Sequence, residues 1–338
     1  MKSLRVLLFA LIAFSLFLMP DQAAAISNRY GMVLTEESDG SYTIRDAKKI
    51  EALIGNPYRL PKALVPYEPQ ISVFDRAAMD SVVPEDRVYK KSVTGDDLHI
   101  RVYRSGRSNA PVAFFIHGGA WAKGSYKGLS AFCKTLAGKY GITVVSIQYS
   151  FAGNPRVRME TTVGDCYDAV EYVLSHAGEF GIDPGRIGFW GSSAGGHLAA
   201  CCAMRFPQTK ALAGWYGAYD LRYTMSFYAP ESEARKHQFY DEYFKDWDPD
   251  YMDRFSPVKM AESLGDLSFK AILFVGTADI TAGPDNAPRY RKALVKAGVK
   301  HVKMRTYRNV THAIGTSFAA DDMYSKTLDL FVKTLQPV

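Results

Sequence analysis

The sequence predicts an α/β fold in which helices cover both faces of a mainly parallel central sheet. From residue 112 onward, apolar runs of strand length alternate with longer segments whose apolar residues recur at helical spacing. Repeated alternation of this kind is typical of a parallel sheet with crossover helices. One predicted strand, residues 186–190, leads directly into a glycine-rich turn and a helix of small residues. With 338 residues, the chain can form one large core or two small ones.

The first 25 residues have the pattern of a secretory signal peptide. Lys2 and Arg5 precede an apolar run over residues 6–19, and Ala23-Ala24-Ala25 follows it. A membrane anchor is the alternative, but the run is shorter than the roughly 20 apolar residues that a span requires. We therefore expect cleavage after Ala25, a secreted or periplasmic protein, and no membrane span in the chain that remains.

Composition argues against nucleic acid as a partner. The chain is 47% hydrophobic and 22% charged, as in ordinary globular proteins. Its formal net charge of +6 is modest, and Lys and Arg are scattered rather than gathered in a basic helix or arm. Disulfides are possible in an exported chain, but all four cysteines fall in predicted helices. We expect these residues to be small buried apolar side chains: Cys133, Cys166, Cys201 and Cys202.

Residues 26–86 are predicted to form an N-terminal extension that packs on the main domain, which spans residues 87–338. The main domain opens with alternating apolar and polar residues at 87–94 and 98–104. The turn-forming sequence Gly95-Asp96-Asp97 separates these two runs, so we expect a β-hairpin.

Strands and helices then alternate along the main domain. Residues 112–116 are apolar throughout, which is typical of a strand buried on both faces. The sequence Asp183-Pro184-Gly185 predicts a turn. The predicted strands are 112–116, 143–148, 186–190, 211–216, 271–275 and 302–307, and the predicted helices are 129–139, 160–176, 194–204, 287–297 and 317–335.

Residues 217–265 interrupt the alternation and form a predicted insertion between two strands. The segment is rich in Tyr, Phe and acidic residues and contains three prolines. Insertions of this length are usually lids or binding segments. The alternative is a surface excursion whose aromatic side chains only cover the core, and both interpretations stay open.

The glycine-rich turn has the G-x-S-x-G pattern of a nucleophile elbow. In this motif a sharp turn from strand to helix exposes a serine, and its neighbours cannot carry bulk. Gly191 and Gly195 stand on either side of Ser193 as the pattern requires. A helix N-terminus behind the serine favours negative charge. Ser193 is therefore the predicted nucleophile, and Ser192, at the variable position, is the weaker candidate.

Two further residues supply what a serine nucleophile needs. A serine hydroxyl requires a base that takes its proton, and the base requires a carboxylate that orients it. Asp279 lies just beyond the predicted strand 271–275, and His312 lies in the loop after the next strand. The carboxyl ends of parallel strands meet at one edge of a sheet, so both residues are expected to face Ser193. The order Ser, Asp, His is that of α/β-hydrolases.

The sequence His117-Gly118-Gly119-Ala120 follows the predicted strand 112–116 and has the features of an oxyanion loop. Acyl transfer places negative charge on the former carbonyl oxygen, and backbone N–H groups must point toward it. Glycines let the main chain approach a ligand closely, and the residue after the nucleophile contributes its own N–H. The predicted donors are Gly118, Gly119 and Ala194.

These motifs resemble those of the α/β-hydrolase superfamily. The similar branch includes hormone-sensitive-lipase-like carboxylesterases, carbohydrate acetyl and feruloyl esterases, and kynurenine formamidases. The resemblance covers roughly residues 85–335 and rests on residues 117–121 and 191–198 together with Asp279 and His312. It implies an α/β-hydrolase fold with Ser193 as nucleophile, His312 as general base and acid, and Asp279 as its orienting carboxylate. No metal or cofactor is expected, because no His or Cys cluster has metal-ligand spacing and no loop matches a phosphate or dinucleotide motif.

Other polar residues near these motifs have plainer interpretations. His197 lies one helical turn after Ser193 and is expected to pack or hydrogen-bond rather than act as the base. His117 is expected to brace the oxyanion loop. Asp285 is a second candidate acid, farther from its strand, and Asp220 is expected to cap the segment that enters the insertion.

The resemblance implies a serine esterase that cleaves small-molecule esters with small acyl groups. Export favours an extracellular ester, such as an acetylated or feruloylated carbohydrate. Two alternatives remain: an arylformamidase-like amidase with the same triad, and a non-catalytic binding protein on a hydrolase fold. Trp121, Trp215 and Tyr216 are candidates for the substrate pocket, or they belong to the core near the sheet edge. The sequence leaves the oligomeric state open.

Overall fold

The computed structural model describes residues 33–36, 42–45, 59–60, 73–227, 243–245, 248–279, 281–308, 310–312, 314 and 319–336. The predicted signal peptide lies outside these residues, as does most of the predicted extension. Within the extension, three short strands form an antiparallel sheet: β1 (Val33–Glu36), β2 (Tyr42–Arg45) and β3 (Arg59–Leu60). The helix α4 (Arg76–Ser81) follows and packs on the main domain.

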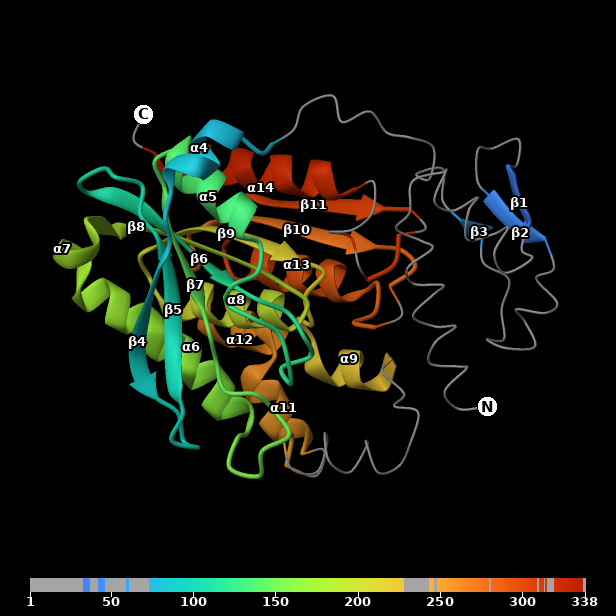
Figure 1. The fold of residues 1–338 in the computed structure, drawn as a ribbon. Coiled ribbons are helices and arrows are strands. Elements are labelled where there is room, and N and C mark those ends of the chain that lie inside the picture. The colour runs from blue at the N-terminus through green and yellow to red at the C-terminus, as the bar shows by residue number, and fades with distance from the viewer. Residues whose placement is uncertain are drawn as a thin grey trace.

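The main domain is built on an eight-stranded sheet in the order β11-β10-β9-β8-β6-β7-β5-β4 (Figure 1). The strands β4 and β5 form the predicted hairpin, and β5 also pairs antiparallel with β7. From β6 to β11 the paired strands run parallel, which confirms the predicted fold class. The strands are β4 (Glu85–Lys91), β5 (Asp97–Tyr103), β6 (Ala110–Ile116), β7 (Thr143–Ile147), β8 (Ile182–Ser192), β9 (Thr209–Trp215), β10 (Lys270–Gly276) and β11 (Val302–Tyr307).

Helices cover both faces of this sheet (Figure 1). On one face lie α4, α5 (Ser130–Gly138) and α14 (Ala320–Leu335). The other face carries α6 (Met159–Ser175), α8 (Ala194–Arg205), α12 (Pro257–Leu264) and α13 (Asn286–Lys296). The short helix α7 (Ala177–Phe180) precedes β8. No described helix is long and apolar enough to span a lipid bilayer.

The strand β6 shows why its sequence is apolar throughout. Phe114 and Ile116 pack in the cluster that includes α6 and α8, whereas Ala113 and Phe115 pack in the cluster that includes α5 and α14. Every residue of β6 is buried because both faces of the strand are covered. The sheet therefore separates two hydrophobic cores and holds the strand ends in fixed positions.

The predicted turn at residues 183–185 is instead a bulge inside β8. Ala110 pairs with Ile182 and Val112 pairs with Ile187, so β8 carries extra residues between these two pairs. The Asp183 carboxylate accepts a hydrogen bond from the Gly185 N–H and closes the bulge locally. The strand then resumes toward the elbow, as β-bulges permit.

The four cysteines are free and buried in α5, α6 and α8, as expected from the sequence. Burial raises the pKa of each thiol, so these residues behave as small apolar side chains. In the predicted insertion the structure describes α9 (Leu221–Phe227), α11 (Pro249–Phe255) and α12, while residues 228–242 and 246–247 lie outside the described part.

Candidate active site

Ser193 lies between β8 and α8 in a backbone conformation that few residues adopt. Its φ of 56° and ψ of −122° are outside the regions favoured by residues with a side chain. A Cβ atom on Gly191 would come within 2.2 Å of the Gly195 carbonyl oxygen, and one on Gly195 within 2.0 Å of the Ile116 carbonyl oxygen. Both glycines are therefore needed for the close approach of β6 and α8 at this turn.

Three predicted residues meet at the carboxyl ends of the parallel strands. His312, in the loop after β11, places Nε2 2.8 Å from the Ser193 Oγ atom. Its Nδ1 atom lies 2.8 Å from Oδ2 of Asp279, which follows β10. The side chains of Asp279, His312 and Ser193 thus form a continuous chain of hydrogen bonds.

Asp279 is buried and held by more than His312. Its Oδ1 atom accepts hydrogen bonds from the backbone N–H groups of Thr281 and Ala282, both at 2.9 Å. Burial acts to raise the pKa of Asp279, but the bond to His312 and the two N–H donors outweigh burial and lower the pKa. Asp279 is therefore an oriented carboxylate. These two donors were not predicted from the sequence, although Asp residues commonly accept bonds from the backbone two residues on.

Tyr216, a candidate pocket residue, packs against His312. The two rings are 5.0 Å apart between centroids and inclined at 74°. The Tyr216 N–H donates to the Phe274 carbonyl oxygen at 2.9 Å, which fixes the residue at the end of β9 despite its positive φ of 39°. Burial raises the pKa of the Tyr216 phenol, so it stays neutral. Tyr216 thus supports one side of the imidazole.

Trp215 lies in the core near the sheet edge, which is the second of the two alternatives that the sequence left open. Its indole is buried on the α14 side of the sheet, packs near Phe132 and Tyr324, and donates to the Thr327 hydroxyl at 2.9 Å. Side chains alternate along a strand, and Trp215 shares a face with Ala211. Only its backbone serves the site, because its carbonyl oxygen accepts the Ser193 N–H.

The predicted oxyanion loop lies directly against the elbow. A Cβ atom on Gly118 would be 3.2 Å from the Ser193 Cβ, so the main chain of Gly118 borders Ser193. Gly119, Ala120 and Trp121 follow with φ values of 124°, 51° and 57°. Ala194 begins α8 beside them and is buried. The three predicted N–H donors therefore belong to segments that border Ser193.

His117 braces this loop from behind. Its ring stacks on Tyr149 at a centroid distance of 4.4 Å, and the Tyr149 hydroxyl donates to the His117 carbonyl oxygen at 2.9 Å. The Nδ1 atom of His117 lies 2.8 Å from the Gly118 carbonyl oxygen, to which it donates. Burial lowers the pKa of His117 and keeps the ring neutral. These contacts match the bracing role expected from the sequence.

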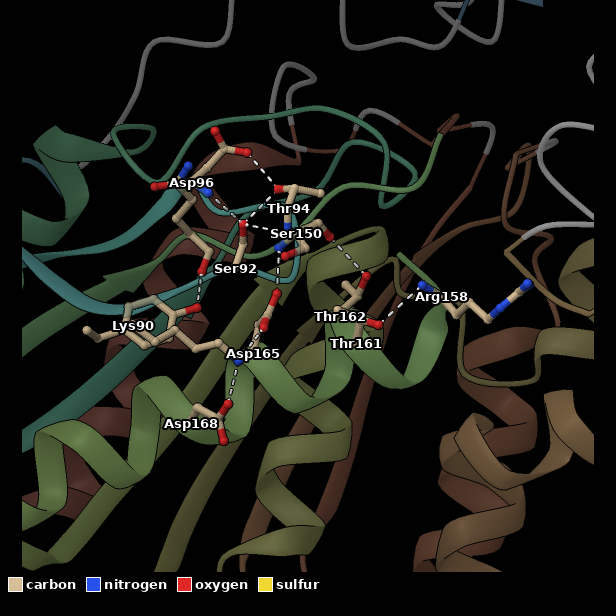
Figure 2. A network of polar contacts seen from close by, with 12 residues as sticks. Lys90, Ser92, Thr94, Asp96, Ser150, Arg158, Thr161, Thr162, Asp165 and Asp168 are labelled. Carbon is tan, nitrogen blue, oxygen red and sulfur yellow. Dashed lines mark hydrogen bonds and ion pairs between the residues drawn. The ribbon is translucent and has the colours of Figure 1, made fainter. Parts of the chain in front are cut away.

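The segment after β7 is fastened by a buried carboxylate (Figure 2). Asp165, on α6, accepts the Ser150 N–H at 2.8 Å and lies 2.7 Å from the Lys90 ammonium. The Thr162 hydroxyl donates to the Ser150 carbonyl oxygen at 2.9 Å. Farther along the same segment, the backbone N–H of residue 152 donates to the Trp121 carbonyl oxygen at 2.9 Å. The anchored segment therefore supports the oxyanion loop.

A small cavity of about 40 Å³ opens beside Ser193. Trp121, a candidate pocket residue, is part of its wall, and the walls are mainly apolar. The insertion contributes part of the wall through residues that were not predicted from the sequence, because helical spacing does not reveal which face of α9 meets the site. The lining residues are Ala120, Trp121, Ser193, Ala194, Ala218, Thr224, Met225, Thr281 and Ala282.

Two aromatic residues of the insertion cover Trp121. Tyr243 and Phe244 are fully buried, and their ring centroids lie 6.3 Å and 6.0 Å from that of Trp121. Asp220 accepts the Tyr223 N–H at 3.1 Å and so caps α9, as expected. Asp285, the second candidate acid, is exposed at the start of α13. Across the described residues, no group of three or more His, Cys, Asp or Glu is arranged to hold a metal ion.

Comparison with known proteins gives a consistent result. A family model described as alpha/beta hydrolase fold matches residues 113–316. An arylesterase of Saccharolobus solfataricus is 29% identical over 253 residues, which are 71% of this chain and 81% of that protein. The carboxylic ester hydrolase LipN of Mycobacterium tuberculosis is 32% identical over 64% of this chain and 60% of its own length.

Solved structures of esterases share the fold. The thermophilic esterase Est2 of the planctomycete Thermogutta terrifontis, solved with propionate bound, has a TM-score of 0.59 and 25% identity. The match covers 75% of this chain and 92% of that one. Family, fold and the arrangement of strand-end residues thus agree with the resemblance seen in the sequence.

Proposed function

Because the chain belongs to the α/β hydrolase fold family, we propose that it is a carboxylic ester hydrolase that forms an acyl-enzyme on Ser193. The observation that carries this proposal is the hydrogen-bond chain from Asp279 through His312 to Ser193, with 2.8 Å at each step. The names of the similar proteins, an arylesterase and a carboxylic ester hydrolase, support the same reaction class.

Acylation begins at Ser193. Its Oγ atom forms a bond to the ester carbonyl carbon while His312 Nε2 takes the hydroxyl proton. The bond from His312 Nδ1–H to Asp279 keeps the ring in the tautomer whose Nε2 accepts a proton, and the carboxylate stabilises the imidazolium that forms. His312 then gives the proton to the leaving alcohol oxygen as the carbon–oxygen bond breaks.

The N–H groups of Gly118, Gly119 and Ala194 hold the negative oxygen of each tetrahedral intermediate. Such donors act mainly in the transition state, where one donor is worth about 2.7–4 kcal/mol. A water molecule next attacks the acyl carbon and passes a proton to His312. The carboxylic acid leaves as that proton returns to Ser193 Oγ.

The acyl group of the substrate is small. The cavity beside Ser193 holds about 40 Å³ and is lined mainly by apolar atoms, with Met225 and Trp121 as its larger side chains. A cavity this small and apolar favours a short acyl chain. The similar Est2 structure has propionate bound, which supports a short acyl group for this chain as well.

The enzyme is exported and acts on an extracellular ester. The support for export is the basic, apolar and small-residue pattern of residues 1–25. An acetylated or feruloylated carbohydrate is the substrate class that this location favours. Expression of the full chain with and without residues 1–25, followed by fractionation of the cells, tests export directly.

Hydrolysis of p-nitrophenyl acetate, butyrate and octanoate tests the activity. We expect acetate and butyrate to be turned over, and Ser193→Ala to lose about 10⁴-fold or more in kcat. Ser192→Ala is the matched control and should lose less than about tenfold, since its hydroxyl is outside the hydrogen-bond chain. Turnover of N-formyl anilides in place of esters would identify an amidase instead. Equal rates for Ser193→Ala and the wild-type protein would rule out the proposal.

A further inference from the structure

A second histidine, His197, lies one turn after Ser193 on α8 and is completely buried. Its two ring nitrogens have partners from two other parts of the chain. The Nδ1 atom lies 3.2 Å from the indole Nε1 of Trp121, at the end of the oxyanion loop. The Nε2 atom lies 2.7 Å from the carbonyl oxygen of Phe255, the last residue of α11 in the insertion.

These partners define the protonation state of His197. An indole N–H only donates, so Nδ1 must accept, and a carbonyl oxygen only accepts, so Nε2 must carry the hydrogen. A protonated ring would place a second N–H opposite the indole N–H of Trp121. Burial lowers the pKa of His197 to about 4, which agrees with a neutral ring in this single tautomer.

Trp121 is the residue through which His197 reaches the oxyanion loop. Ala120 and Trp121 both have φ values in the left-handed region, at 51° and 57°, which side chains disfavour. Such a conformation persists only where surrounding contacts hold it. The Trp121 carbonyl oxygen accepts one backbone bond from the segment after β7, and its indole is held by His197. Its ring also stands edge-on to that of His197, at a centroid distance of 5.4 Å.

We propose that His197 is a positioning residue that fixes the Trp121 indole. It thereby holds the N–H groups of Gly118 and Gly119 in position beside Ser193 for oxyanion stabilisation. Through Phe255 the same ring joins the insertion to the oxyanion loop. This inference rests on the proposed function. Oxyanion donors act in the transition state, so a displaced loop lowers kcat more than it changes KM.

Two variants of equal polarity separate the two contacts of His197. In His197→Asn the amide oxygen lies close to the position of Nδ1 and can still accept the Trp121 N–H. In His197→Gln the longer side chain reaches the position of Nε2 and can still donate to Phe255, but Trp121 loses its acceptor. We expect His197→Asn to keep kcat within about threefold, and His197→Gln to lower kcat about 10- to 100-fold with KM within about threefold.

The indole N–H of Trp121 gives a readout that does not depend on activity. Its ¹H–¹⁵N signal is assigned by its loss in Trp121→Phe. The signal should exchange slowly with D₂O in the wild-type protein and His197→Asn, and at least about tenfold faster in His197→Gln. If His197→Gln does not fold, Trp121→Phe removes the same bond while keeping a ring, and should show the same fall in kcat.

Equal losses of kcat in the Asn and Gln variants would overturn the proposal, as would an unchanged kcat in His197→Gln with a fast-exchanging indole. A change confined to KM or to thermal stability would also overturn it, because a purely structural residue would behave that way. Ser193→Ala, measured in parallel, separates failure of the His197 proposal from failure of the proposed function. If the proposed function is wrong, Ser193→Ala is as active as the wild-type protein, whereas failure of the His197 proposal alone leaves Ser193→Ala inactive.

Discussion

The carbonyl oxygen of Ile116 lies 2.0 Å from the point that a Cβ atom on Gly195 would occupy. The last residue of β6 and the first turn of α8 are therefore in backbone contact, with no space for a side chain between them. The same approach brings the loop after β6 against Ser193. The spacing of these two elements is thus a condition for the site as well as for the fold.

Gly195→Ala should force β6 and α8 apart at this point. We expect a loss of about 3 kcal/mol or more in the free energy of unfolding, together with loss of ester hydrolysis. Gly164, inside α6, is the matched control because a Cβ there meets no atom within 4 Å. Gly164→Ala should raise stability by about 0.5–1 kcal/mol. Urea unfolding measures both changes, and a Gly195→Ala protein of normal stability would contradict the argument.

The role of Asp279 predicts a change in rate without a change in fold. Asp279→Asn keeps the size of the side chain but removes the charge that orients and stabilises His312. We expect kcat to fall about 10⁴-fold while far-UV and near-UV circular dichroism stay unchanged. Asp285→Asn, at the exposed second candidate, should retain nearly full activity. The assignment fails if the two variants lose similar amounts of activity.

We expect Met225 to limit the length of acyl chain that the cavity accepts. It is almost fully buried and lines the cavity beside Ser193. Met225→Ala should raise the ratio of kcat/KM for octanoate over acetate by about tenfold or more, since each methylene matters in an apolar pocket. Met204→Ala is the control, because Met204 is also buried but lies at the far end of α8. Both variants should lose about 2–5 kcal/mol of stability, and only the first should change selectivity.

The buried side chain of His197 should make the free energy of unfolding depend on pH. Its pKa is lowered from 6.5 in the unfolded chain to about 4 in the folded protein, so folding favours the neutral ring. The contribution of His197 to the free energy of unfolding is fully present above pH 6.5. As pH falls from 6.5 toward 4, this contribution is lost, up to about 3 kcal/mol. The difference in stability between the wild-type protein and His197→Asn should narrow over this range.

Urea unfolding at pH 7.0 and 4.5 measures that difference. Other groups with shifted pKa values, such as His117 and Asp279, titrate in both proteins and cancel from the comparison. A difference that stays constant between the two pH values would show that His197 does not change protonation on unfolding.

Much of the site could be predicted because its parts are local in sequence. The elbow around Ser193 requires small residues within a few positions, and Asp279 and His312 each follow an apolar strand that is easy to recognise. Parallel strands then bring these ends together without knowledge of any individual contact. The order of the parts along the chain was therefore sufficient to predict the hydrogen-bond chain that the structure contains.

Contacts that depend on tertiary packing could not be predicted from the sequence in this way. Trp215 is next to the elbow in space, but the alternation of side chains along β9 directs its indole into the opposite core. Asp183-Pro184-Gly185 has turn chemistry, yet pairing of β8 with β6 on both sides of it makes it a bulge. The wall that α9 contributes near Met225 depends on how the insertion folds back, which has no short-range signal.

The unusual backbone of Ser193 has a consequence for the cost of catalysis. A φ of 56° at a non-glycine residue is unfavourable by about 1–3 kcal/mol. The contacts that β6 and α8 make around Ser193 on folding offset this strain. The hydroxyl of Ser193, the proposed nucleophile, is consequently held in place before any substrate arrives and needs no backbone rearrangement for the reaction. The energy for arranging the nucleophile is therefore spent once, when the protein folds, and not again at each turnover.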